Sequence, residues 1–218
     1  MLADVNVHQR LRVGCSRSRL GVTLVAYAYR RTLNVTPMKK LTKRVLITGM
    51  SGSGKSAVTQ ELIARGFLAI DLDTAEWSEW VDTDSDALTP GRGKDWIWRE
   101  GRVRTLLSEP KDVPLFVSGT AANMGQFYSL IDLVILLSAP VATIMERLEA
   151  RPAGVYGHSV EDRRKVNTLI STIEPLLRKS ADHEIDTRSP THTTVDEILR
   201  LANVFGAGAA KMWQEAAP

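Results

Sequence analysis

The sequence predicts an α/β fold in which a five-stranded parallel sheet is sandwiched by helices, with a short lid. Three observations predict it. From Arg44 onward, short apolar runs alternate with longer segments of 3.6-residue periodicity. The first apolar run leads through a glycine-rich turn into a helix, and that helix stops at Gly66. Such alternation is typical of βαβ units, whose strands lie parallel in one sheet.

The first half of this pattern starts with a strand at 44–48, built on the β-branched run Val45-Leu46-Ile47. A helix should follow from about Lys55 to Arg65, because glycine is common just past a helix end. The second strand is expected at 67–70. A short helix at 74–81, an acidic loop and a helix at 94–108 should come next, before a buried strand at 114–117.

The second half continues with a fourth strand at 133–137. Ser138 is expected to cap the next helix, with Pro140 in its first turn. Residues 160–180 are predicted to be helical with a kink at Pro175, and 184–186 forms a weak fifth strand. Thr194 and Glu197 have the spacing of a capping box for a last helix.

Charge divides the chain unevenly. Residues 1–37 carry six arginines against the single acid Asp4, whereas residues 38–218 hold 22 basic and 24 acidic side chains. We expect 1–37 to be a disordered or non-native basic extension, with a transit peptide and a secretory signal as alternatives. Residues 38–218 should form one domain that begins near Met38.

The composition excludes several classes of function. A mildly acidic domain is not typical of nucleic-acid binders, and no stretch reaches the roughly 20 apolar residues that cross a bilayer. Cys15 is the only cysteine, which rules out an internal disulfide and suits a reducing, cytoplasmic location. We therefore expect no nucleic-acid partner and no membrane; the oligomeric state is left open.

Residues 49–56 fit the pattern G-x-x-x-x-G-K-S without a mismatch, between an apolar strand and a helix. In such a phosphate-binding loop, backbone N–H groups converge on phosphate oxygens at a helix N-terminus. Lys55 should bridge the β- and γ-phosphates of ATP or GTP, and the Ser56 hydroxyl should bind Mg²⁺. The residues expected to bind the nucleotide here are Gly49, Ser51, Gly52, Ser53, Gly54, Lys55, Ser56 and Ala57.

Asp71 and Asp73 follow the second strand at its carboxyl end, where open parallel sheets bind ligands. Their spacing points both side chains to the same side of an extended chain. They could hold the water shell of a metal ion, one could accept a proton from a substrate hydroxyl, or one could only cap the next helix.

Four tryptophans lie on either side of the acidic loop 82–86. They could line an acceptor pocket, or they could be the packing between two small helices. These residues are Trp77, Trp80, Trp96 and Trp98.

These residues together resemble the nucleoside-monophosphate-kinase-like branch of P-loop kinases, particularly the shikimate kinase and gluconate kinase type and small AAA-type ATP-binding proteins. The resemblance implies that Asp71 is associated with the metal and Asp73 with the acceptor hydroxyl. Trp98-Arg99 looks like the aromatic-Arg pair of a helix that anchors the substrate, although Arg102 stands where a glutamate is expected. Gly119 belongs to a shortened glycine turn that would also contact the substrate.

Arg147 and Arg151 resemble the two arginines that begin the lid in adenylate kinases. By that resemblance Arg147 packs on the adenine and Arg151 reaches the phosphates as a catalytic residue, while 153–159 is a short lid. The alternative is a solvated helix flank paired with Glu146 or Asp162.

The sequence therefore predicts a kinase that transfers the γ-phosphoryl group of ATP to a hydroxyl or phosphate of a small molecule. ATP and Mg²⁺ are the expected cofactors, and Lys55, Asp73 and Arg151 the expected catalytic residues. A second hypothesis is an ATP-dependent switch with weak hydrolysis and no small-molecule acceptor.

Overall fold

The computed structural model describes residues 42–83 and 93–204. These residues belong to a unit that spans Lys40–Pro218, and residues 1–41 lie outside the described ranges. The extension expected at 1–37 therefore stays a prediction, and so does most of the acidic loop 82–86.

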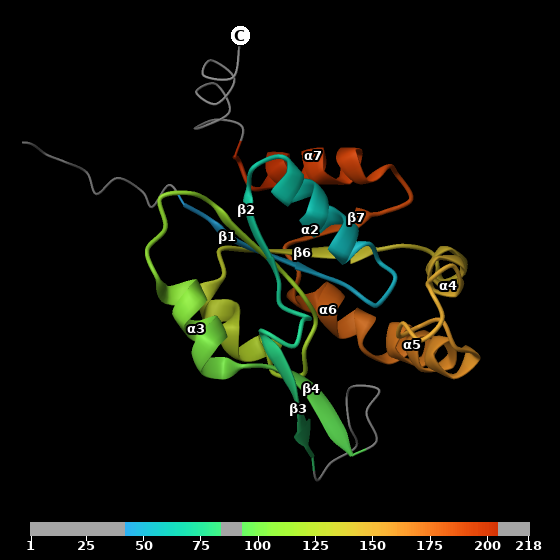
Figure 1. Cartoon of the computed structure of the whole chain (residues 1–218). Coiled ribbons are helices and arrows are strands. Elements are labelled where there is room, and N and C mark those ends of the chain that lie inside the picture. Colours follow the sequence, from blue (N-terminus) through green and yellow to red (C-terminus); the bar gives the residue numbers. More distant parts are fainter. Residues whose placement is uncertain (1–41, 84–92, 205–218) are drawn as a thin grey trace, which may run out of the picture. The chain divides into compact units, whose positions relative to one another are not determined.

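The main sheet has five parallel strands in the order β2-β5-β1-β6-β7 (Figure 1). The predicted five-stranded parallel sheet is confirmed. Each strand lies within a residue or so of its expected position because short β-branched and apolar runs carry the signal locally. The strands are β1 (Arg44–Thr48), β2 (Leu68–Asp71), β5 (Leu115–Ser118), β6 (Leu133–Ser138) and β7 (His183–Asp186).

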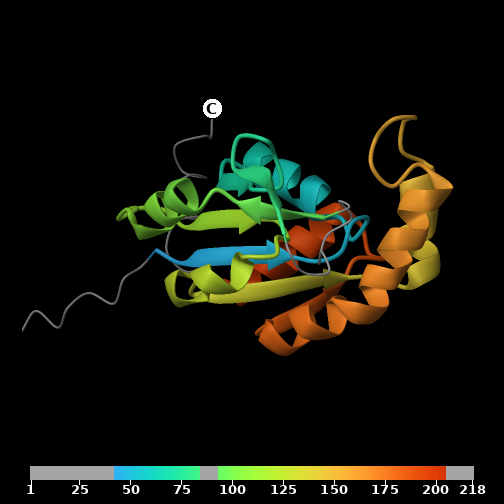
Figure 2. The same cartoon turned by 90° about the horizontal axis from the view of Figure 1, so that it is seen from below.

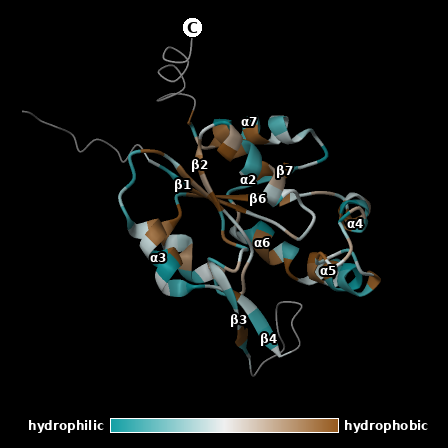
Figure 3. Cartoon of the chain, in the orientation of Figure 1, coloured by the Kyte–Doolittle hydropathy of each residue, from teal (hydrophilic) through white to brown (hydrophobic). Residues whose placement is uncertain are grey.

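Helices cover both faces of this sheet, because successive side chains of a buried strand point to opposite faces. On one face, Val45 and Ile47 of β1 pack with buried residues of α2 and α7. On the other face, Leu46 packs with α3, η1 and α6. Figure 3 shows the central strands as the most hydrophobic part of the molecule. The helices in these two layers are α2 (Lys55–Ala64), α3 (Glu100–Ser108), the 3-10 helix η1 (Met124–Leu130), α6 (Glu174–Ser180) and α7 (Thr191–Leu201).

Two further helices stand at the carboxyl ends of the strands (Figure 2). They are α4 (Val141–Glu149) and α5 (Val160–Thr172), and they form a small core of their own from Ile144, Leu148 and Val166. The loop between them contains the predicted lid segment 153–159. The expected kink near Pro175 appears as a break at Ile173, with the proline in the first turn of α6.

The helices expected at 74–81 and at the start of 94–108 are wrong. These residues form an antiparallel hairpin of β3 (Ser78–Asp82) and β4 (Lys94–Trp98), and α3 begins only at Glu100. Trp80 lies directly opposite Trp96, with ring centroids 5.0 Å apart. Aromatic cross-strand pairs of this kind stabilise a hairpin, and the sequence distance between the two strands hid the pairing.

Both predicted caps are also wrong in position. Ser138 is the last residue of β6, and Pro140 occupies the cap position before α4. Thr194 lies inside α7, which begins at Thr191, and its hydroxyl donates to the Pro190 carbonyl. In both cases a proline just before the helix sets where it begins.

Leu46→Ala should lower the free energy of unfolding by about 2–5 kcal/mol, because it leaves a cavity in a fully buried position of β1. Urea denaturation monitored by circular dichroism measures this change. The matched control is Val113→Ala, at a side chain 53% exposed, which should stay within about 0.5 kcal/mol of wild type. Equal effects of the two substitutions would contradict the assigned core.

Candidate active site

The phosphate-binding loop connects β1 to α2 and adopts the backbone that its glycines permit. Gly52 has φ of 88° and Gly54 has φ of 100°, both in the left-handed region. A Cβ atom on Gly52 would lie 2.9 Å from Cγ2 of Ile144, and one on Gly49 only 2.3 Å from the Leu137 carbonyl oxygen. Only glycine fits these positions, so the loop closes tightly over the first turn of α2.

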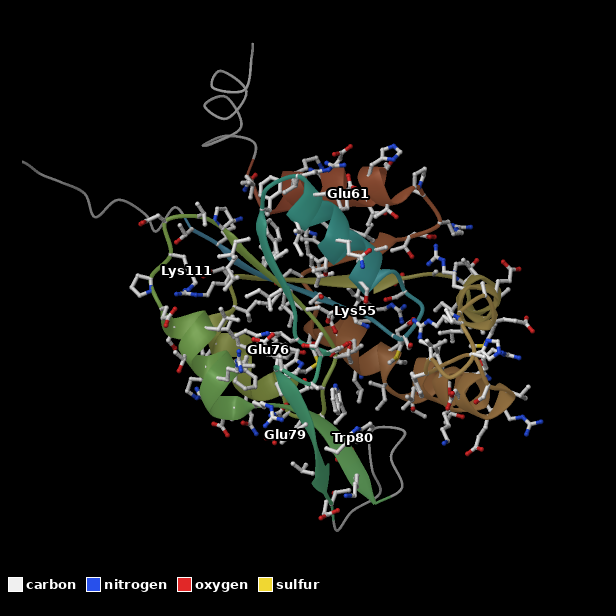
Figure 4. The ribbon with its side chains drawn as sticks, in the orientation of Figure 1. Lys55, Glu61, Glu76, Glu79, Trp80 and Lys111 are labelled. Carbon is white, nitrogen blue, oxygen red and sulfur yellow. The ribbon has the colours of Figure 1, made fainter. Side chains whose placement is uncertain are left out.

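Lys55 lies folded over this loop. Its Nζ donates to the Gly49 carbonyl at 2.7 Å and lies 3.8 Å from Oδ2 of Asp73. The ammonium group therefore stands between the loop and the end of β2, near the centre of the molecule in Figure 4. A phosphate held by the loop would meet this cation beside the carboxylate.

Ser56 and Asp71 meet at the first turn of α2. The Ser56 hydroxyl donates to Oδ2 of Asp71 at 3.2 Å, while Oδ1 of Asp71 accepts from the backbone N–H of Asp73 at 3.0 Å. A hydroxyl and a carboxylate are the hard oxygen ligands that Mg²⁺ prefers, and a few of them suffice because the ion keeps several waters. This donor pair fits the predicted magnesium site.

Asp73 is held by Thr120. Oδ1 of Asp73 accepts from the Thr120 N–H at 2.9 Å, and the Thr120 hydroxyl donates to the Gly49 carbonyl at 2.9 Å. Burial raises the pKa of Asp73 above its ordinary value of 3.8, although Lys55 and the Thr120 N–H oppose the rise. The side chain is 28% exposed, toward the cavity that it lines. It is thus a fixed carboxylate with increased basicity.

Gly119 makes room for this carboxylate. A Cβ atom on Gly119 would lie 2.7 Å from Oδ1 of Asp73 and 3.2 Å from Nε1 of Trp98. Gly119 itself does not line the cavity. The sequence pointed to this glycine as a substrate contact, and the structure places it where its missing side chain admits Asp73.

Arg147 and Arg151 both reach the phosphate-binding loop from α4 and the residues just after it. Arg147 donates to the Gly52 carbonyl at 3.2 Å and to Thr187, and Arg151 donates to the Ser51 hydroxyl at 3.1 Å. Burial lowers the pKa of Arg151, which at neutral pH still leaves it charged. The alternative of a flank paired with Glu146 or Asp162 is wrong.

A cavity of about 1,030 Å³ joins these groups. It is lined by Asp71, Asp73 and both arginines, and by every predicted loop residue except Ser53, which is fully buried beneath the loop. It is also lined by Trp80 and Trp96, for which the sequence left an acceptor pocket open, and by Tyr128 and apolar residues of α5 and α6, which had no predicted role.

Arg99 lies apart from the cavity, contrary to its predicted place in an acceptor-binding helix. Its Nη1 donates to Oε2 of Glu79 at 2.7 Å on the outer side of the hairpin. Because the preceding residues form a strand, Arg99 points to the face of the hairpin opposite to Trp98.

The sequence left two roles open for the four tryptophans, packing and the lining of a pocket, and the structure shows two in each role. Trp98 is fully buried in the main core, and Trp77 packs against that core at its edge. Trp80 and Trp96 line the cavity. Thr120 and Thr187, which hold Asp73 and Arg147, could not be found from the sequence because their partners are distant in the chain.

Asp73→Asn should change the pH dependence of stability. The pKa of Asp73 is raised in the folded protein, so its contribution to stability is greatest when it is protonated and is lost as the pH rises through the folded pKa. The free energy of unfolding of wild type relative to the variant should therefore fall as the pH rises above about 3.8. Urea titrations at several pH values measure it, and a relative stability that rises with pH would contradict the assignment.

Comparison with known proteins gives three findings. Residues 45–167 match the AAA domain family. Shikimate kinase 2 of Enterobacter sp. (strain 638) is 27% identical over 174 residues, which cover 74% of this chain and 98% of that protein. The structure of shikimate kinase from Acinetobacter baumannii in complex with shikimate superimposes with a TM-score of 0.51 at 19% identity, covering 77% of this chain and 97% of the other. That likeness shows that the two chains share a fold.

Proposed function

We propose that this chain, which belongs to the AAA domain family, transfers the γ-phosphoryl group of ATP to a hydroxyl group of a small molecule. The observation that carries the proposal is the 3.8 Å separation between Nζ of Lys55 and Oδ2 of Asp73. It places the cation of a phosphate-binding loop beside a basic carboxylate, at the floor of a cavity large enough for a nucleotide and an acceptor. The similarity to a shikimate kinase agrees with this chemistry.

The transfer follows from these positions. The acceptor hydroxyl oxygen attacks the γ-phosphorus, and the bond from that phosphorus to the β–γ bridging oxygen breaks, so that ADP leaves with the bonding electron pair. The hydroxyl proton passes to Asp73, whose raised pKa suits it to accept one. Lys55 and Arg151 supply positive charge beside the transferred group.

Ser56 and Asp71 would hold Mg²⁺, which neutralises charge on the phosphates when it is bound. Arg147 donates hydrogen bonds to Gly52 in the loop and to Thr187, which follows β7. These contacts would hold the backbone N–H groups of the loop in the positions from which they bind a phosphate. The loop between α4 and α5 would act as the lid that excludes water.

No helix within the described residues is long and apolar enough to cross a bilayer.

The decisive test measures ADP formation with a panel of hydroxy acids, sugars, alcohols and nucleoside monophosphates. One acceptor should stimulate ADP formation, and Asp73→Asn should remove that stimulation while nucleotide affinity, measured by calorimetry, stays within about threefold. We expect the rate to fall by about 10²–10⁴-fold, the usual contribution of a general base. Slow turnover that no acceptor stimulates would instead support the ATP-dependent switch.

Lys55→Ala should abolish phosphoryl transfer without unfolding the chain, because the ammonium group binds the phosphates and its contacts in the fold are one ion pair and hydrogen bonds to carbonyls of the loop. Mass spectrometry of the product measures the loss of transfer, and thermal melting measures whether the fold is retained. Lys111→Ala is the matched control, since Lys111 pairs with Glu109 away from the cavity and its loss should leave the rate unchanged. Retained transfer in the Lys55 variant would overturn the assignment.

A further inference from the structure

We infer that the acceptor half of this cavity takes a neutral alcohol with a flat aromatic body, and not an anionic hydroxy acid. The inference rests on the proposed function, because it names the substrate class of the same site. Three features carry it: an aromatic wall that starts beside Asp73, an apolar wall that faces the same cavity, and the positions of the basic side chains.

The aromatic wall is one face of the β3–β4 hairpin. Residues opposite each other in the two strands are Ser78 with Trp98 and Trp80 with Trp96, and both pairs lie on the same face because side chains alternate along a strand. Glu79 belongs to the other face. Figure 4 shows Glu79 and Trp80 on opposite sides of the hairpin. The cavity thus meets the tryptophan side of the ribbon and not its charged side.

The buried end of this face of the hairpin lies near Asp73, and its exposed end, Trp80 and Trp96, lines the cavity. Trp98 is fully buried, and its Nε1 has no hydrogen-bond partner of good geometry among the described residues. Oδ1 of Asp73 and Nε1 of Trp98 both lie beside Gly119, 2.7 Å and 3.2 Å from the place where its Cβ atom would be. Two residues earlier on the same face stands Trp96, with Trp80 beside it. An acceptor whose hydroxyl reaches Asp73 would therefore contact the indole rings of Trp80 and Trp96, which line the same cavity.

The wall is fixed in place by the segment after β5. The side-chain amide of Asn123 exchanges two hydrogen bonds of 2.9 Å with the backbone of Trp98. The N–H of Ala122 donates to the Trp96 carbonyl at 3.1 Å. Held at this end of β4, the indole rings present a preorganised surface, which lowers the entropy cost of binding a rigid ligand.

Most of the other residues lining this half are apolar or neutral, and the charged exceptions on α5 are Asp162 and Lys165. Leu176 lines the cavity although 56% of it is exposed, and Trp80 does so at 49%. Large apolar side chains left open to solvent inside a cavity mark a surface that a ligand covers. The neutral polar groups here are the hydroxyls of Tyr128 and Ser180, which lie 3.0 Å apart. The remaining apolar lining consists of Met124, Val166, Leu169, Ile173 and Leu177.

The basic side chains among the described lining residues are committed elsewhere. Lys55, Arg147 and Arg151 contact the phosphate-binding loop, and Lys165 pairs with Glu161 at 3.0 Å. Arg99 is bound to Glu79 on the outer face of the hairpin. A carboxylate on the acceptor would lose its water against indole and leucine side chains, a cost that only a paired cation offsets.

A matched series of benzyl alcohols that carry a para carboxamide, carboxylate or aminomethyl group tests the charge preference. Binding to the full chain is measured by titration calorimetry with ADP and Mg²⁺ present. The neutral carboxamide should bind at least about tenfold more tightly than either charged twin, because only it avoids burying a charge. Equal or tighter binding of a charged twin would overturn the inference, and so would the failure of all three to bind.

Substitutions at Trp80 test the aromatic wall. Trp80→Ala should weaken carboxamide binding by about tenfold, while Trp80→Phe keeps a ring and should retain most of the affinity. Trp80→Arg should shift the preference toward the carboxylate twin. The control is Ile63→Ala, at a side chain 54% exposed on α2 outside the cavity, which should bind as wild type does. Unchanged binding in Trp80→Ala would contradict the wall.

ADP formation with the same compounds separates this inference from the proposed function. If the carboxamide binds through Trp80 but neither it nor any panel acceptor stimulates ADP formation, the proposed phosphoryl transfer is overturned and the inferred ligand class is supported. If shikimate or gluconate stimulates ADP formation and the carboxamide neither binds nor reacts, the kinase function stands and the inference is overturned.

Discussion

Thr120 connects the phosphate-binding loop to Asp73 through a few hydrogen bonds. Its hydroxyl donates to Gly49 at the start of the phosphate-binding loop, and its N–H donates to Asp73 after β2. Since its hydroxyl proton goes to Gly49, the Thr48 hydroxyl 3.0 Å away must act as donor to it. The ends of β1, β2 and β5 are thereby held together, and the distance between Lys55 and Asp73 depends on this contact.

The environment of Asp73 follows from that arrangement. A carboxylate at the floor of a cavity loses part of its hydration, which raises its pKa, while Lys55 keeps the ionised form within reach. Burial and the nearby ammonium group thus act on the pKa of this carboxyl in opposite directions, and the effect of burial is the larger. Gly119 allows this placement because any side chain there would collide with the carboxylate.

The cavity combines two unlike environments. At the loop, glycine backbone, Lys55 and two arginines create a charged and polar site that suits phosphates. Beyond Asp73, the hairpin and the helices α5 and α6 create an apolar site with few polar groups. The similarity to a shikimate kinase covers 174 residues at 27% identity, and the hairpin supplies the two tryptophans that line this second part of the cavity.

The sequence by itself determined the loop, the order of the main-sheet strands along the chain and the pair Asp71–Asp73, because each depends on residues close together in the chain. It could not determine whether 78–82 and 94–98 are helical, since short segments rich in tryptophan fit both periods and the two segments that pair are far apart in the chain. The formation of strands in place of helices decided which side chains of this segment line the cavity. At the end of a strand Trp98 and Arg99 face opposite ways, whereas in a helix their directions would differ by only about 100°. Only the tertiary structure turned the tryptophans toward Asp73 and Arg99 toward Glu79, because side-chain direction follows from strand pairing and not from residue type.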